Sequence, residues 1–187
     1  MAEILGITGT PGTGKKSVAP LVAEALGRKL LGLNELARAH GLLERTADES
    51  EVDTEELRKK LRESDLGPAL VFGHLLPYVF EKGSLERVVV LRCEPSVLKG
   101  RLAARGYPRT KVLDNVEAEL IGLVSSDAHD AFGKDRTFEL DTTRSTPAQA
   151  ARKAALILGG KPGSAARIDW TRTYGSGAKL RSLLSVP

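Results

Sequence analysis

The chain has 187 residues, of which 41% are hydrophobic and 28% charged, with a net charge of +4 and one cysteine, Cys93. This length and composition fit one folded domain of ordinary size and exclude a largely disordered chain. A lone cysteine excludes an internal disulfide and a thiol metal cluster, and favours a buried packing role for Cys93. The apolar runs are far shorter than the roughly 20 residues of a membrane helix, and no signal pattern is apparent. We therefore expect a cytoplasmic protein with no membrane partner.

The predicted elements begin with a short apolar strand at residues 3–8, which runs into a glycine-rich turn. Helical spacing of apolar residues follows from Ser17 to Leu26. Pro95 opens a second predicted helix, and Thr146 with Pro147 opens a third. Further strands are predicted at residues 69–72, 87–92 and 137–140. Strands that alternate with helices predict a three-layer α/β fold with a parallel sheet.

The turn after the first strand has the spacing of a phosphate-binding loop. Residues 9–15 read Gly-Thr-Pro-Gly-Thr-Gly-Lys, and they lie between a strand and a helix. Such a loop directs backbone N–H groups and the helix N-terminus at phosphates, while the lysine neutralises their charge. A purely structural glycine turn is the alternative. We expect ATP to contact Gly9, Thr10, Gly12, Thr13, Gly14, Lys15, Lys16 and Ser17.

The residue after the loop lysine departs from the strict motif. A Ser or Thr normally follows the lysine and binds magnesium, but here Lys16 follows and the hydroxyl is displaced to Ser17. Ser17 is therefore the candidate metal contact for the Mg²⁺ that accompanies ATP. Lys16 either adds positive charge near the phosphates or points to solvent.

Several segments in order along the chain resemble the sixth-isoform adenylate kinase family, which has archaeal and nuclear members. They are the loop itself and residues 34–38, 90–93, 101–107, 114–119 and 139–143. The resemblance covers about residues 3 to 160. It implies a P-loop NTPase fold of the nucleoside monophosphate kinase type at 1–160, followed by a basic tail at 161–187. Adenylate kinases also lack a hydroxyl directly after the loop lysine and hold magnesium largely through water and nucleotide.

The same resemblance implies an ATP-dependent nucleoside monophosphate kinase, converting ATP and AMP to two ADP, with additional ATPase activity. It also implies a role in maturation of the small ribosomal subunit, with ribosomal protein uS11 as a partner. By this resemblance residues 32–64 form the monophosphate-binding lobe, with Asn34 and Arg38 as acceptor-binding residues. Residues 104–114 form the lid, in which Arg105 closes on ATP, assisted by Arg101 or Arg109. Lys15, His74 and Arg105 are then the catalytic residues.

One departure from the family concerns the end of the third predicted strand. The family has Asp, one residue, then His, whereas this chain reads Phe72-Gly73-His74. A carboxylate there helps to hold magnesium, so its loss should slow chemistry while nucleotide binding persists. His74 either positions the attacking group or is an ordinary strand-end histidine. Asp48 and Asp53 are possible substitutes for the carboxylate, although Asp53 with Glu56 also resembles a helix cap.

The chain therefore has competing interpretations. The main one is the kinase, and the alternative is an assembly ATPase in which nucleotide switches the grip on uS11 and RNA. A shikimate or gluconate kinase shares the loop but does not explain the other segments. Five basic residues and one acidic residue give the tail a net charge of +4. Such a tail either binds rRNA or an acidic partner, or is simply solvated. Trp170, the only tryptophan, either anchors the tail on the domain or stacks on RNA.

Overall fold

The computed structural model describes residues 4–45, 50–163, 166–175 and 177–185. Its centre is a five-stranded sheet in the order β2-β5-β1-β6-β7, in which every neighbouring pair is parallel. The strands are β1 Leu5–Thr8, β2 Lys29–Gly32, β5 Ala69–Phe72, β6 Arg87–Arg92 and β7 Thr137–Asp141. The expected three-layer α/β fold with a parallel sheet is thus confirmed.

The two strands with the strongest apolar runs have the predicted bounds. β5 and β6 are buried along almost their whole length, because helices cover both faces of the sheet. β2 was not predicted from the sequence. It is an edge strand whose first residue, Lys29, is exposed, so its four residues lack both alternation and a long apolar run.

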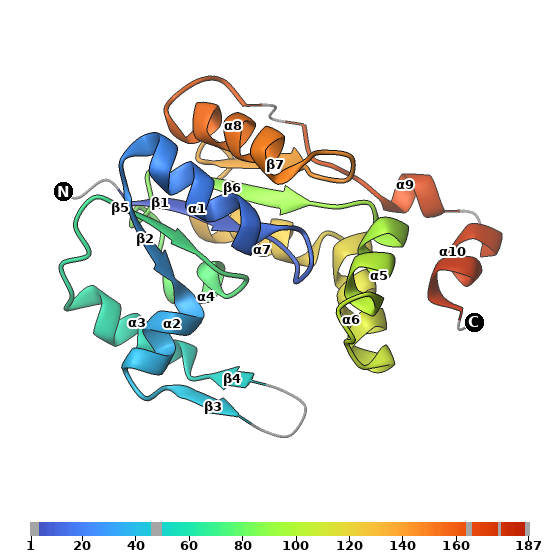
Figure 1. Cartoon of the computed structure of the whole chain (residues 1–187), viewed down its shortest axis with the longest axis horizontal. Coiled ribbons are helices and arrows are strands. Elements are labelled where there is room, and N and C mark those ends of the chain that lie inside the picture. The colour runs from blue at the N-terminus through green and yellow to red at the C-terminus, as the bar shows by residue number, and fades with distance from the viewer. Residues whose placement is uncertain (1–3, 46–49, 164–165, 176, 186–187) are drawn as a thin grey trace.

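Helices lie on both faces of the sheet (Figure 1). On one face α1 Lys15–Leu26 and α8 Pro147–Leu158 pack side by side over Leu5, Ile7 and Val89. The opposite face is covered by α2 Leu33–Ala39, α3 Thr54–Arg62, α4 Leu76–Val79 and α7 Leu123–Phe132, whose apolar residues meet Val88 and Val90. The alternate residues of one strand therefore serve two separate cores.

Helix starts follow the capping chemistry expected from the sequence. The Asp53 side chain accepts a hydrogen bond of 2.9 Å from the backbone N–H of Glu56 and so caps α3. Thr146 and Gln149 form a reciprocal capping box at the start of α8. Between α2 and α3 the chain forms a small antiparallel hairpin of β3 Leu43–Arg45 and β4 Ser50–Val52, which projects away from the sheet (Figure 1).

A third apolar cluster lies beyond the carboxyl end of the sheet. Here α5 Pro95–Ala103 and α6 Arg109–Leu120 pack together, and two short helices near the C-terminus, α9 Thr171–Tyr174 and α10 Gly177–Leu184, cover them. Tyr174 and Leu183 are buried in this cluster together with Cys93. Cys93 is thus a packing residue, and burial raises the pKa of its thiol to about 11.

Candidate functional site

The phosphate loop occupies the turn from β1 to α1, at the carboxyl edge of the sheet. Gly9 and Gly12 have φ values of 139° and 95°, which side chains rarely tolerate. Space is also limiting, since a Cβ on Gly9 would lie 2.3 Å from the Leu91 carbonyl oxygen and one on Gly12 would lie 2.6 Å from Leu98. The two glycines are therefore required by conformation and by packing.

Lys15 begins α1 and folds back over the loop. Its ammonium group donates to the carbonyl oxygens of Gly9 and Thr10, the latter at 3.0 Å. Burial, together with the nearby charges of Arg105 and Lys16, lowers the pKa of Lys15 to about 7, while the negative charge of Glu119 opposes this shift. A phosphate at the loop would give the Lys15 ammonium group a negatively charged partner in place of two neutral carbonyl oxygens.

A small cleft of about 60 Å³ joins the loop to the ends of β2 and β5. It brings together residues from three segments that are distant in sequence. Its lining residues are Lys15, Lys16, Leu33, Asn34, Glu35, Phe72, Gly73 and His74. Four of the residues expected at the site, Lys15, Lys16, Asn34 and His74, thus share one cleft at the edge of the sheet where parallel α/β folds bind ligands.

Glu35 was not singled out by sequence reasoning, yet among the residues that the structure describes it alone supplies a carboxylate to the lining of this cleft. Its carboxylate lies over Gly32, at a point that is also close to the ring of Phe72. Glu35 falls inside the segment 34–38 that carried the family resemblance. An acidic residue in the first turn of a helix that follows a strand was the signal that could have identified it.

His74 is neutral at physiological pH. Burial, followed by the positive charges of Lys15 and Lys111, lowers its pKa to about 4. A neutral imidazole can orient a ligand through a hydrogen bond, but it adds no positive charge to the site.

The arginines expected from the sequence occupy different places. Arg38 is exposed on α2, and Arg105 is exposed in the turn between α5 and α6. Arg105 is nevertheless near enough to affect the charge of Lys15. Arg101 is directed elsewhere, because its guanidinium donates to the carbonyl oxygens of Thr142 and Thr143, both at 3.0 Å. It therefore fastens α5 to the loop after β7.

Three buried threonine hydroxyls hold the phosphate loop against the rest of the fold. Thr142 donates to the carbonyl oxygen of Thr13 at 2.8 Å, and Thr10 donates to the carboxylate of Glu119 at 2.6 Å. Thr13 in turn donates to the Thr10 carbonyl at 2.8 Å. The phosphate loop is thus held by Thr142, which directly follows β7, and by Glu119 of α6.

The oxygen donors near the loop suit magnesium. Ser17 is exposed in the first turn of α1, and Glu35 lines the adjacent cleft. Among the described residues, no group of three His, Cys, Asp or Glu side chains could hold a metal ion alone. Asp53 is engaged as a helix cap, and Asp48 lies outside the described residues.

Within the described part of the chain, no helix is both long and apolar enough to cross a lipid bilayer. The parallel sheet and the loop define the chain as an α/β P-loop protein. Shikimate kinase from Acinetobacter baumannii, solved with shikimate, has this fold, with a TM-score of 0.57 at 19% identity over 86% of this chain and 96% of its own.

The sequence comparisons place the chain within that class. The family model of an AAA domain matches residues 5–122. A protein of Thermococcus onnurineus named "Putative adenylate kinase" is 36% identical over 175 residues, which are 91% of this chain and 93% of its own. A protein of the same name from Pyrococcus furiosus is 36% identical over 176 residues, again 91% and 93%. The chain belongs to this family of adenylate kinase-like P-loop proteins.

Proposed function

We propose that this protein is a nucleoside monophosphate kinase that transfers the γ-phosphate of ATP to AMP or a similar acceptor. The observation that carries the proposal is the cleft in which Lys15 from the phosphate loop meets Asn34 and His74. The relatives of similar length, which are named for adenylate kinase activity, support it. Phosphoryl transfer requires positioning and positive charge rather than covalent catalysis, and this cleft is lined by residues suited to both.

In this proposal the loop from Gly9 to Ser17 binds the phosphates of ATP. Residues 32–64 bind the monophosphate through Asn34 and Arg38, and residues 104–114 close as a lid through Arg105. Arg38 and Arg105 are exposed, as residues must be if they are to meet substrate from the moving parts of the enzyme. A planar guanidinium pairs well with phosphate oxygens and stays charged at working pH.

Lys15, His74 and Arg105 take the catalytic roles. Lys15 leaves the carbonyl oxygens of Gly9 and Thr10 and pairs with phosphate, while neutral His74 orients the reacting groups by hydrogen bonding. Mg²⁺ bound with ATP neutralises phosphate charge and orients the transferred group. Ser17 and Glu35 are the side chains that would hold it or its waters.

A second candidate function is an assembly ATPase. Phe72 provides no carboxylate to the cleft, which favours slow chemistry and a role in which nucleotide switches binding of a partner. The family resemblance makes uS11 and rRNA the partners to test, in the setting of small ribosomal subunit maturation. Exposed basic residues of the C-terminal region, among them Arg172 and Arg181, would supply contacts to RNA.

The deciding experiment is an assay with ATP, Mg²⁺ and each common nucleoside monophosphate, run beside ATP alone and ATP with purified uS11. Product analysis separates ADP from free phosphate. We expect acceptor-dependent ADP without matching phosphate release, and loss of that signal in Lys15→Met. Phosphate release alone, or only in the presence of uS11, would reject the kinase and support the assembly ATPase.

A further inference from the structure

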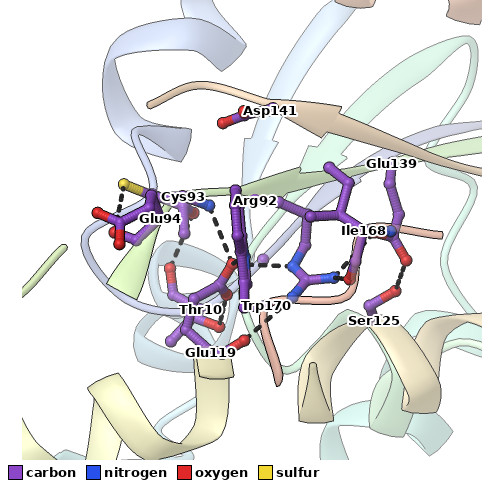
Figure 2. A network of polar contacts seen from close by, with 12 residues as sticks. Thr10, Arg92, Cys93, Glu94, Glu119, Ser125, Glu139, Asp141, Ile168 and Trp170 are labelled. Carbon is purple, nitrogen blue, oxygen red and sulfur yellow. Dashed lines mark hydrogen bonds and ion pairs between the residues drawn. The ribbon is translucent and has the colours of Figure 1, made fainter. Parts of the chain in front are cut away.

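A buried carboxylate connects the phosphate loop to the C-terminal end of the chain. Glu119, near the end of α6, is 1% exposed, and both of its oxygens are bonded. One oxygen accepts the Thr10 hydroxyl at 2.6 Å. The other accepts from the guanidinium of Arg92 at 2.8 Å, the backbone N–H of Cys93 at 2.9 Å and the indole of Trp170 at 3.2 Å. Figure 2 shows Glu119 among these partners.

Trp170 belongs to a segment that we call the C-terminal strap, residues 166–175 and 177–185. The strap is packed onto α5 and α6 through Tyr174 and Leu183, both buried. Lys99 of α5 donates to the carbonyl oxygens of Leu183 and Ser185, at 2.7 Å and 2.9 Å. The strap therefore covers α5, which precedes the proposed lid, and α6, whose first half belongs to it.

The strap also completes the charge balance of the buried network. Arg92 lies between Glu119 and Glu139, so one guanidinium faces two carboxylates. Glu139 accepts the backbone N–H of Ile168 at 2.7 Å, and the guanidinium of Arg167 lies 3.8 Å from it. The strap thus supplies three groups to the two buried carboxylates: the indole N–H of Trp170, the backbone N–H of Ile168 and the guanidinium of Arg167. A buried carboxylate that loses such partners is costly, so the network and the docked strap stabilise each other.

We propose that Glu119 is a positioning residue that couples docking of the C-terminal strap to nucleotide binding at the phosphate loop. The inference rests on the proposed function, in that the loop must bind a nucleotide. Thr10 and Trp170 are bonded to opposite oxygens of one carboxylate, so neither can shift without altering the partner set of the other. The strap then acts on the site without touching the ligand.

The direction of the coupling follows from charge. Phosphates bring negative charge to the loop, where the Glu119 carboxylate already accepts the Thr10 hydroxyl. Glu119 then depends more strongly on its remaining donors, including the Trp170 indole, so nucleotide tightens the strap. By reciprocity a docked strap strengthens nucleotide binding by the same factor.

The test uses the full chain and its single tryptophan as the probe. Titration of the protein with ADP and Mg²⁺ should change the emission of Trp170, with the same Kd that calorimetry gives. Thr10→Val removes the hydroxyl that bonds to Glu119, so this variant should bind ADP more weakly and show little change of Trp170 emission. This measurement keeps Trp170 in place and does not depend on the behaviour of strap variants.

A double-mutant cycle distinguishes coupling of Thr10 to Trp170 through Glu119 from a general loosening of the strap. Trp170→Phe keeps an aromatic ring but loses the indole N–H, and we expect it to weaken ADP binding about 5- to 10-fold. The double variant of Thr10→Val and Trp170→Phe should bind ADP no more weakly than the single variant with the lower affinity, because both substitutions act through Glu119. Lys179→Gln, at an exposed position on α10, is the matched control and should bind as the wild type.

Additive effects of Thr10→Val and Trp170→Phe would overturn the coupling. So would a full change of Trp170 emission in Thr10→Val, or wild-type affinity in Trp170→Phe. Each of these results leaves the proposed function intact, since the wild type still binds ADP. Failure of the wild type to bind ADP at all would instead overturn the proposed function on which the coupling rests.

Discussion

The ammonium nitrogen of Lys15 lies 3.0 Å from the carbonyl oxygen of Thr10, so in the free protein the loop lysine is bonded to its own loop. This contact is made in a buried setting that lowers the pKa of Lys15 from 10.5 to about 7. A bound phosphate favours the charged form, so binding above pH 7 requires uptake of a proton.

Nucleotide affinity should therefore fall as the pH rises above 7. Between pH 7.5 and 9, where the phosphates of ADP are already ionised, we expect the Kd for ADP to rise by up to about tenfold per pH unit. Calorimetry in buffers of different ionisation enthalpy should show the proton uptake directly. Lys15→Met should bind more weakly and lose this slope; a slope that persists in Lys15→Met would assign the proton to another group.

Glu35 should contribute to metal-dependent turnover, because its carboxylate lines the cleft together with Lys15 and His74. Glu35→Gln keeps the shape of the side chain and removes its charge. We expect a drop in kcat of about 10- to 100-fold, with a higher Mg²⁺ concentration needed for half-maximal rate. The control is Glu55→Gln, an exposed acid of α3, and an equal loss in that variant would show that the effect is not specific to the cleft.

Phe72 lines the cleft beside His74, at the position where the family resemblance leads us to expect an aspartate. If a damaged magnesium site limits turnover, Phe72→Asp should raise kcat by about tenfold or more. Phe72 also packs against the core under α1, so the variant should melt at a lower temperature. Phe72→Leu keeps the apolar contact and should not gain activity. Unchanged kcat in Phe72→Asp would refute this account of the position.

The local part of the site could be predicted because its signals are local. The phosphate loop needs glycines at fixed spacing between a strand and a helix, and a chain that has them shows them in seven residues. His74 and Asn34 were assigned to the site through the family resemblance, and the structure places them just after β5 and β2, whose carboxyl ends lie at the same edge of the sheet. Their roles remain predictions.

The buried network could not be predicted in the same way. Thr10 and Glu119 are 109 residues apart, and a glutamate in a polar helical segment usually faces solvent. The sequence did contain one sign, since Arg92 ends an apolar strand that is otherwise free of charge after Arg87. The role of the tail also depends on distant contacts. Of the two alternatives for Trp170, docking on the domain is the one that the structure shows.

Arg92 should be among the most important residues for stability, because it is 2% exposed and pairs with two buried carboxylates. Arg92→Met keeps much of the side-chain volume but leaves Glu119 and Glu139 without their shared guanidinium. We expect a loss of about 3 to 5 kcal/mol in the free energy of unfolding, measured by urea denaturation. Arg62→Gln breaks an exposed ion pair with Glu81 and should cost at most about 1 kcal/mol. Comparable losses in the two variants would mean that Arg167 and the strap donors suffice to hold the two carboxylates without Arg92.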